Sequence, residues 1–277
     1  MYRNIKRWLC GILVFGLLFT SAFPVNASIS TERADASYNG FVYKYDNYRR
    51  VEITRYTGEA TSVKVPAKVN GKKVVNVTID SKTKKLKKIT ISKNVLRCSL
   101  NAAPALTGVR VASTNPYICA QNNYVLTKDK KVLLTVPGAR KIMDNIPDGV
   151  KVIEDYSCEG SKVEKLVLGK NVQEIGVCAF RNCTDLKTVV INAKLQYIDG
   201  SAFQGCTLLK TINIRKNILE VVSGAFRDSG LEKAIIRNPK CYIGTNAFPK
   251  DTVIYGYKGS TAEKYALFNG NRFVVLD

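Results

Sequence analysis

Cysteine is the residue type in this chain best suited to chemistry, because a thiolate can bind a metal ion or attack a substrate. The sequence holds eight cysteines and no histidine. Cys178 and Cys183 have the C-x4-C spacing of a metal-binding pair. No second pair lies in register with them, so we expect no metal site. The absence of histidine also excludes Ser-His-Asp and Cys-His catalysis, since both need an imidazole base.

The cysteines also raise the question of disulfide bonds. Cys183 and Cys206 lie 23 residues apart, at the same position of adjacent sequence repeats. Stacked strands lie about 4.8 Å apart, which suits the Cα spacing of a disulfide, but parallel side chains would strain the bond. We therefore expect Cys183 and Cys206 to be buried thiols, with a bond between them as the alternative. Loss of Cys10 with a leader would leave an odd number of cysteines, which also allows a free thiol or an intermolecular bond.

The remaining groups suited to catalysis form no recognisable set. The 22 aspartates and glutamates are scattered along the chain, and residues such as Glu174, Asp199 and Glu220 lie mainly in expected turns between strands. No phosphate-binding loop and no dinucleotide-binding motif is present. We therefore expect a protein that is not an enzyme and that has no cofactor.

The glycines and apolar residues instead follow a repeat with a constant period. Each repeat opens with alternating apolar residues, which is typical of a strand with one buried side. Each closes on an Ala-Phe pair, and successive pairs are 23, 23 and 22 residues apart. The pairs are Ala179-Phe180, Ala202-Phe203, Ala225-Phe226 and Ala247-Phe248.

A fixed period in the twenties predicts one supersecondary unit stacked on copies of itself. We expect parallel coils with one strand each at about 163–168, 186–191, 209–214 and 231–236, and a buried ladder of the four phenylalanines. Weaker coils are expected upstream, with strands near 86–91 and 106–111 and with Cys158 at the place of Phe180. The alternative is a β-sandwich in which the phenylalanine spacing is coincidental.

The repeat resembles the BspA-like subfamily of leucine-rich repeats, which occurs in bacterial secreted and surface proteins. The likeness is carried by Ile175-Gly176-Val177-Cys178-Ala179-Phe180 through Cys183, and the I-G-x-x-A-F core recurs at 243–248. It is clear over about residues 150–250 and degenerate over about 60–150. The chain departs from the pattern at Ser157-Cys158 and at Ser229. The resemblance implies a solenoid used for adhesion or ligand binding.

The two ends of the chain predict its export and its domain organisation. Three basic residues precede an apolar stretch, and Val25-Asn26-Ala27 has the small residues of a cleavage site, so residues 1–27 are expected to be a secretory signal peptide.

We then expect a β-rich N-terminal cap at 28–80, a leucine-rich repeat solenoid at 81–250, and an α/β C-terminal cap at 251–277. Ser260 and Glu263 have capping-box spacing for a helix from Thr261 to about 268. The predicted protein is secreted, either extracellular or associated with the cell surface, without a transmembrane segment after cleavage.

The charge of the chain is strongly positive. The formal net charge is +21, from 43 basic and 22 acidic residues. Removal of residues 1–27 takes away three basic residues and no acidic one, which leaves +18. Such a charge predicts attraction to anionic polymers, although lysines can also serve solubility alone. The densest cluster is Lys82–Lys88. No motif for specific nucleic-acid binding is present.

Outward positions of the expected strands stack into columns. One column is aliphatic and the columns beside it carry cations, which suits a partner-binding sheet face. The alternative is that exposed β-branched residues simply favour strands. The candidate ligand-binding residues are Lys165, Val190, Arg215, Lys233 and Arg237.

The expected partner of this face is a host or cell-wall macromolecule, either a protein or an anionic glycan. The second hypothesis is a structural cell-envelope protein held electrostatically on anionic wall polymers without a specific ligand.

Overall fold

The computed structural model describes residues 36–277, apart from residues 81 and 193. The expected signal peptide, residues 1–27, lies outside the described residues. The first described strands, β1 to β3, pair antiparallel, and β3 then pairs parallel with β6. The strands of this sheet are β1 (Ala36–Tyr38), β2 (Phe41–Tyr45), β3 (Val51–Tyr56), β5 (Lys68–Val69), β6 (Lys72–Thr78) and β8 (Arg97–Ser99).

A tight turn joins β5 to β6. Val69 pairs with Lys72, and Asn70 and Gly71 between them have φ angles of 48° and 74°. Two consecutive residues with positive φ are typical of the type I′ hairpin turn, which favours the Asn-Gly sequence. The sequence Asn70-Gly71 thus explains the tight connection between β5 and β6.

Three parallel strands form the next sheet. β7 (Lys88–Ile91) lies between β4 (Ser62–Lys64) and β9 (Gly108–Val111). Leu86, Ile89, Ile91, Leu106 and Val109 are buried beneath it. The weak upstream coils expected near 86–91 and 106–111 are confirmed.

An antiparallel hairpin follows and interrupts the regular coils. It consists of β10 (Ile118–Gln121) and β11 (Tyr124–Thr127), and Asn122 and Asn123 form its turn with φ angles of 53° and 60°. β11 then pairs with β12 (Val132–Thr135), which begins a long run of parallel pairing.

Each of the four strands expected at about 163–168, 186–191, 209–214 and 231–236 lies within its range, and further strands extend the same sheets. β13 (Ile142–Met143), β15 (Lys165–Val167) and β17 (Thr188–Val190) form one parallel sheet. β19 (Thr211–Ile214), β21 (Lys233–Ile236), β23 (Val253–Gly256) and β24 (Phe273–Val275) form another. The repeat solenoid is therefore confirmed.

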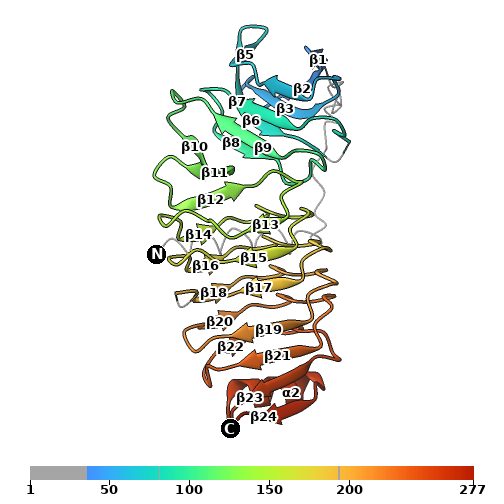
Figure 1. Cartoon of the computed structure of the whole chain (residues 1–277), viewed down its shortest axis with the longest axis vertical. Helices are drawn as coiled ribbons and strands as arrows, with labels where there is room; N and C mark the ends of the chain where they lie inside the picture. Colours follow the sequence, from blue (N-terminus) through green and yellow to red (C-terminus); the bar gives the residue numbers. More distant parts are fainter. Residues whose placement is uncertain (1–35, 81, 193) are drawn as a thin grey trace, which may run out of the picture. The chain divides into compact units, whose positions relative to one another are not determined.

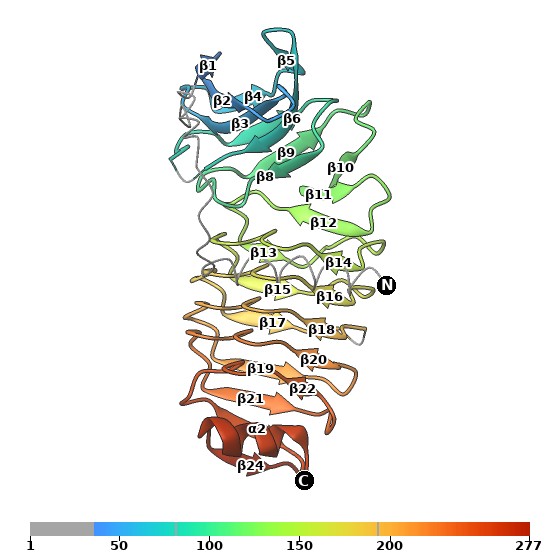
Figure 2. The same ribbon diagram turned by 180° about the vertical axis from the view of Figure 1, so that it is seen from behind.

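Each regular coil also holds a second strand, so the expectation of one strand per coil was too low. These strands extend the β12 sheet in parallel: β14 (Val152–Ile153), β16 (Glu174–Ile175), β18 (Tyr197–Ile198), β20 (Glu220–Val221) and β22 (Tyr242–Ile243). Figures 1 and 2 show β15 with β16, and β17 with β18, in successive layers of the stack.

The Ala-Phe pairs close the coils as expected. Phe180, Phe203, Phe226 and Phe248 are buried, and each ring stacks on the next at centroid distances of 5.1–5.3 Å. Backbone hydrogen bonds also join the Ala-Phe pairs of adjacent coils. The Phe203 amide, for example, donates to the Ala225 carbonyl of the next coil at 2.7 Å. Alanine suits this place because its small side chain lets neighbouring coils approach closely.

The ladder ends on the helix α2 (Thr261–Asn269). The Tyr265 ring packs edge-on against Phe248 at 5.8 Å, and its hydroxyl accepts a hydrogen bond from the Phe248 amide. Ser260 caps the helix by accepting from the Glu263 amide, and Gly270 ends it at φ 75°. The helix expected from the capping box is present. In the part of the chain that the structure describes, no helix is long and apolar enough to cross a bilayer.

Asparagine side chains bind each coil to the one before it. The amide nitrogens of Asn217 and Asn238 donate to the carbonyls of Leu195 and Ile218. Asn115 is fully buried; it donates to the Ser92 and Val95 carbonyls of the preceding coil and accepts from the nearby Tyr117 and Ile118 amides. Backbone groups that the turns leave unpaired are satisfied in this way.

Candidate binding face

The five candidate residues lie on or directly after the first strands of the coils. Lys165 begins β15, Val190 ends β17 and Lys233 begins β21. Arg215 and Arg237 follow β19 and β21. The pairing puts Lys165 beside Thr188 and Val167 beside Val190, so the outward columns expected from the period-2 pattern are formed. Val190 is 45% exposed, and Lys165 and Arg237 are exposed as well.

These residues do not share one continuous sheet. β17 belongs to the β13-β15-β17 sheet and β19 to a separate one, so no ladder of backbone hydrogen bonds joins the two. The Arg215 guanidinium crosses this break and donates to the Ile191 carbonyl at 3.2 Å. Arg215 therefore stabilises the stack in addition to presenting a charge.

Lys233 is also engaged within the protein. Its ammonium lies 4.2 Å from the centre of the Tyr255 ring, and the residue is half-buried. A cation at this distance from an aromatic face is attracted by the ring's quadrupole. Lys165, Val190 and Arg237 are consequently the candidates that remain most available to a partner.

One neighbouring column differs from the expectation. Gly169 and Asn192 hold the positions of the earlier coils that correspond to Arg215 and Arg237, so strand alternation predicts that they face outward. Asn192 is instead half-buried, and its side chain donates to the Gly169 and Val172 carbonyls of the preceding coil. Asn192 therefore belongs to the asparagine contacts between coils.

Ion pairs border the first strands. Lys141 lies 3.0 Å from Glu164, and Lys210 lies 2.9 Å from Glu232. The hydrogen bond and charge of Glu164 raise the pKa of Lys141. Because these side chains are exposed, such pairs contribute little to stability, but they compensate part of the positive charge of the coil edges.

Cys183 and Cys206 are buried within the coils, as expected. The Cys183 thiol donates to the Cys158 carbonyl at 3.1 Å, and the Cys206 thiol donates to the Phe180 carbonyl at 3.2 Å. Burial raises the pKa of Cys183 to about 11 and raises that of Cys206 as well. Both are free thiols, and this environment keeps them protonated and unreactive at neutral pH.

The described residues contain no group of three or more Cys, Asp or Glu side chains that could hold a metal ion. Cys178 is buried with a φ of 54°. That backbone conformation recurs at the equivalent position of the other coils, directly before the Ala-Phe pair or, in one coil, before Ser157-Cys158. The residues are Tyr156, Ser201, Gly224 and Asn246. The column of positive φ angles marks Cys178 as a turn residue.

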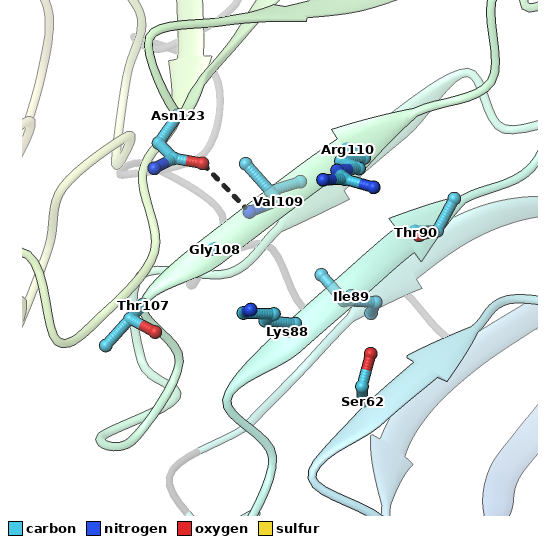
Figure 3. Close-up of a pocket in the computed structure, with 9 residues that line it drawn as sticks. All are labelled: Ser62, Lys88, Ile89, Thr90, Thr107, Gly108, Val109, Arg110 and Asn123. Atoms are coloured by element: carbon cyan, nitrogen blue, oxygen red, sulfur yellow. Dashed lines mark hydrogen bonds between the residues drawn. The ribbon is translucent and has the colours of Figure 1, made fainter.

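A hollow that no sequence pattern predicts lies over β4, β7 and β9. Its volume is about 590 Å³, and Lys88 and Arg110 both line it, as Figure 3 shows. Lys88 belongs to the cluster Lys82–Lys88, which was the only sequence signal for this region. The hollow depends on a hairpin turn folding over β9, and no local pattern predicts that contact.

Parallel coils with two strands each and a buried phenylalanine ladder define a leucine-rich-repeat solenoid. Residues 143–254 match the family model of the BspA type leucine rich repeat region in 6 copies. This part of the chain is a BspA-type leucine-rich repeat region. The comparison with curated proteins found no match.

Solved structures of bacterial leucine-rich repeat proteins are similar to this chain. The crystal structure of the pneumococcal vaccine antigen PcpA has a TM-score of 0.55 and 19% identity, over 76% of this chain and 61% of that chain. This chain thus spans about three fifths of the PcpA chain, and the likeness is one of fold.

Two further structures match less closely in space. A leucine rich cell surface protein from Faecalibacterium prausnitzii has a TM-score of 0.44 and 15% identity, over 88% of this chain and 95% of that one. The leucine rich repeat protein of T. pallidum has a TM-score of 0.34 and 18% identity, over 76% and 86%.

Proposed function

We propose that this protein is a secreted or cell-surface binding module that contacts a host or cell-wall macromolecule through the outward face of its first strands. The observation that carries the proposal is the outward geometry of the first strands: Val190 is 45% exposed in the coil after that of Lys165, and Arg237 is exposed directly after β21. Stacked coils repeat the same outward chemistry at each step, which suits an extended polymer or a long protein surface.

Several further observations support binding rather than catalysis. The chain has no histidine, and the BspA-type repeats occupy residues 143–254. The structure from Faecalibacterium prausnitzii bears the description of a leucine rich cell surface protein. The signal-like residues 1–27 and the net charge of +21 agree with export toward anionic surfaces.

The alternative is a structural envelope protein held on wall polymers by charge alone. The positive charge of the whole chain favours it, since charge attraction needs no defined site. Salt separates the two hypotheses, because exposed charges are screened within about 10 Å at 0.1 M salt. An aliphatic contact such as one through Val190 is not screened.

The experiment measures binding of the secreted protein to bacterial cell walls and to arrays of glycans and host-matrix proteins, at low and high salt. Val190→Ser and the double variant K165Q/R237Q are compared with K250Q/K258Q, which removes the same charge from exposed lysines elsewhere. We expect binding that survives high salt in the parent and in K250Q/K258Q but falls in the other two. Loss of all binding at high salt, or equal binding by every variant, contradicts the proposal.

A further inference from the structure

The hollow over β4, β7 and β9 lies where the regular stack is interrupted. β9 pairs with β7 on one side only, and the hairpin β10–β11 follows before the first strands resume at β13. The hairpin turn lies against the open edge of β9, where the Asn123 side-chain oxygen accepts a hydrogen bond from the Val109 amide at 3.3 Å (Figure 3). Asn123 thus forms one wall of the hollow.

That wall is held in place from behind. Arg140 donates to the Asn122 carbonyl at 3.0 Å and to the Asn145 side chain at 2.9 Å. Its guanidinium also lies 4.0 Å from the centre of the Tyr124 ring. The Asn122 side chain in turn donates to the Asn145 carbonyl at 3.0 Å. These contacts fix the hairpin turn over β9, so the hollow is formed before any ligand arrives.

The outward residues of the three strands are basic and hydroxylic. Ser62, Lys88 and Gly108 form one row across the sheet, and Lys64, Thr90 and Arg110 form the next. Each strand therefore presents one exposed cation. Among the described residues that line the hollow, none is acidic and none is aromatic. Gly108 leaves the floor without a side chain between Lys88 and the Asn123 wall.

We propose that this hollow binds an acidic polysaccharide, with a carboxylate or sulfate group between Lys88 and Arg110. Arginine matches such oxyanions with paired N–H donors, and lysine adds a compact charge. The hydroxyls of Ser62 and Thr90 and the Asn123 amide suit the hydroxyl groups of a sugar. A chain crossing the strands passes one cation on each strand, alternating between the two rows, and adjacent strands lie about 4.8 Å apart.

The lining also disfavours nucleic acid as the occupant. Single strands bind through bases stacked on aromatic side chains in addition to phosphate contacts, and the described lining offers no aromatic ring. This site is separate from the face of β15, β17 and β21 and does not depend on the function proposed for that face.

The test measures fluorescence anisotropy of four labelled probes: a size-defined heparin oligosaccharide, an oligogalacturonate, a neutral dextran oligosaccharide and a single-stranded oligodeoxynucleotide. K88Q/R110Q removes both cations, and K250Q/K258Q removes the same charge elsewhere. Asn123→Asp keeps the acceptor for the Val109 amide but adds a negative charge to the wall. Gly108→Thr fills the floor without changing the charge. Circular dichroism and thermal unfolding verify that each variant is folded.

We expect the parent to bind both acidic oligosaccharides and not dextran. K88Q/R110Q should weaken this binding about tenfold or more, since removing one charge-assisted hydrogen bond has an effect of that order. Asn123→Asp and Gly108→Thr should also weaken it, whereas K250Q/K258Q should change it by less than about twofold.

Two results would overturn the proposal. Parent-like binding by the folded Asn123→Asp and Gly108→Thr variants would mean that the saccharides follow diffuse charge and not the hollow. Tighter binding of the oligodeoxynucleotide, abolished in the same variants, would reassign the hollow to nucleic acid.

Discussion

The rings of Phe203 and Phe226 stack face to face across adjacent coils, with centroids 5.1 Å apart and planes within 5° of parallel. Both side chains are fully buried, and each belongs to a ladder that continues in both directions. A coil cannot cover its own phenylalanine, so the ring of one coil is part of the core of the next.

The Phe203→Ala variant should therefore lose about 3–5 kcal/mol of unfolding free energy, because the substitution removes apolar burial and leaves a cavity between two rings. Urea unfolding measured by circular dichroism gives the value. Phe268 is the matched control, since its side chain on α2 is 82% exposed and Phe268→Ala should change stability little. Equal midpoints for Phe203→Ala and the parent would contradict the ladder as a source of stability.

The sequence predicts the ladder and the first strands because both depend on a residue pattern that recurs at a fixed period. A strand of four residues with alternating burial, such as Thr211–Ile214, is long enough for apolar and polar residues to alternate visibly in the sequence. The second strands contain only two residues, such as Glu174–Ile175, and two residues are too few to show a period. Their pairing is fixed by stacking and not by local sequence.

The candidate face could be predicted only as a set of columns. The alternation of side chains along a strand predicts that Lys165 and Val190 face outward. The contacts of Arg215 with the Ile191 carbonyl and of Lys233 with the Tyr255 ring join different coils, so no local pattern reveals them. The Asn123 contact with β9 likewise depends on how the hairpin folds back.

Asn115 should be among the polar residues most costly to replace. Its side chain is fully buried, and its four hydrogen bonds lie between 2.8 and 2.9 Å. Asn115→Ala leaves two carbonyls and two amides without these partners, at a cost of about 1–3 kcal/mol for each group that water cannot reach. Thermal unfolding should show a clear loss of stability.

Asn171→Ala provides the comparison for Asn115. Asn171 makes an exposed bond to the Asp148 carbonyl at 2.9 Å, where water can replace the missing donor. Its replacement should cost much less than that of Asn115. Similar losses for the two variants would mean that the burial of Asn115 does not determine its contribution.

Gly224 occupies the turn position at which the other coils also have positive φ. Its φ is 67°, and an added Cβ would meet only ordinary contacts, the nearest being the Ser201 hydroxyl at 3.5 Å. Gly224→Ala should therefore cost about 1–2 kcal/mol through backbone strain alone. Ser201 has a φ of 55° at the equivalent position, so Ser201→Gly should be neutral or stabilising in the same unfolding assay. A stabilised Gly224→Ala variant would contradict the strain argument.

The buried thiols predict a loss of stability at alkaline pH. Burial raises the pKa of Cys183 to about 11, and that of Cys98 and Cys241 to about 12, from the ordinary value of 9.0. Between these values the unfolded chain has released protons that the folded chain keeps. Because the folded state then binds more protons, the free energy of unfolding falls as the pH rises from about 9 toward the folded-state pKa values. Below the unfolded pKa the thiols impose no such dependence.

Replacing Cys183 and Cys206 by alanine isolates this effect, because the unfolded variant releases two fewer thiol protons. Its free energy of unfolding should fall less steeply with pH above about 9 than that of the parent, even though the loss of two buried sulfurs lowers its stability at neutral pH. Urea unfolding at a series of pH values measures both slopes under reducing conditions. Thiol labelling at neutral pH completes the experiment, since the native parent should react at Cys183 and Cys206 only after denaturation. Rapid native labelling of these two residues, a mass that reveals a bond between them, or identical alkaline slopes for parent and variant would contradict buried, protonated thiols at the coil turns.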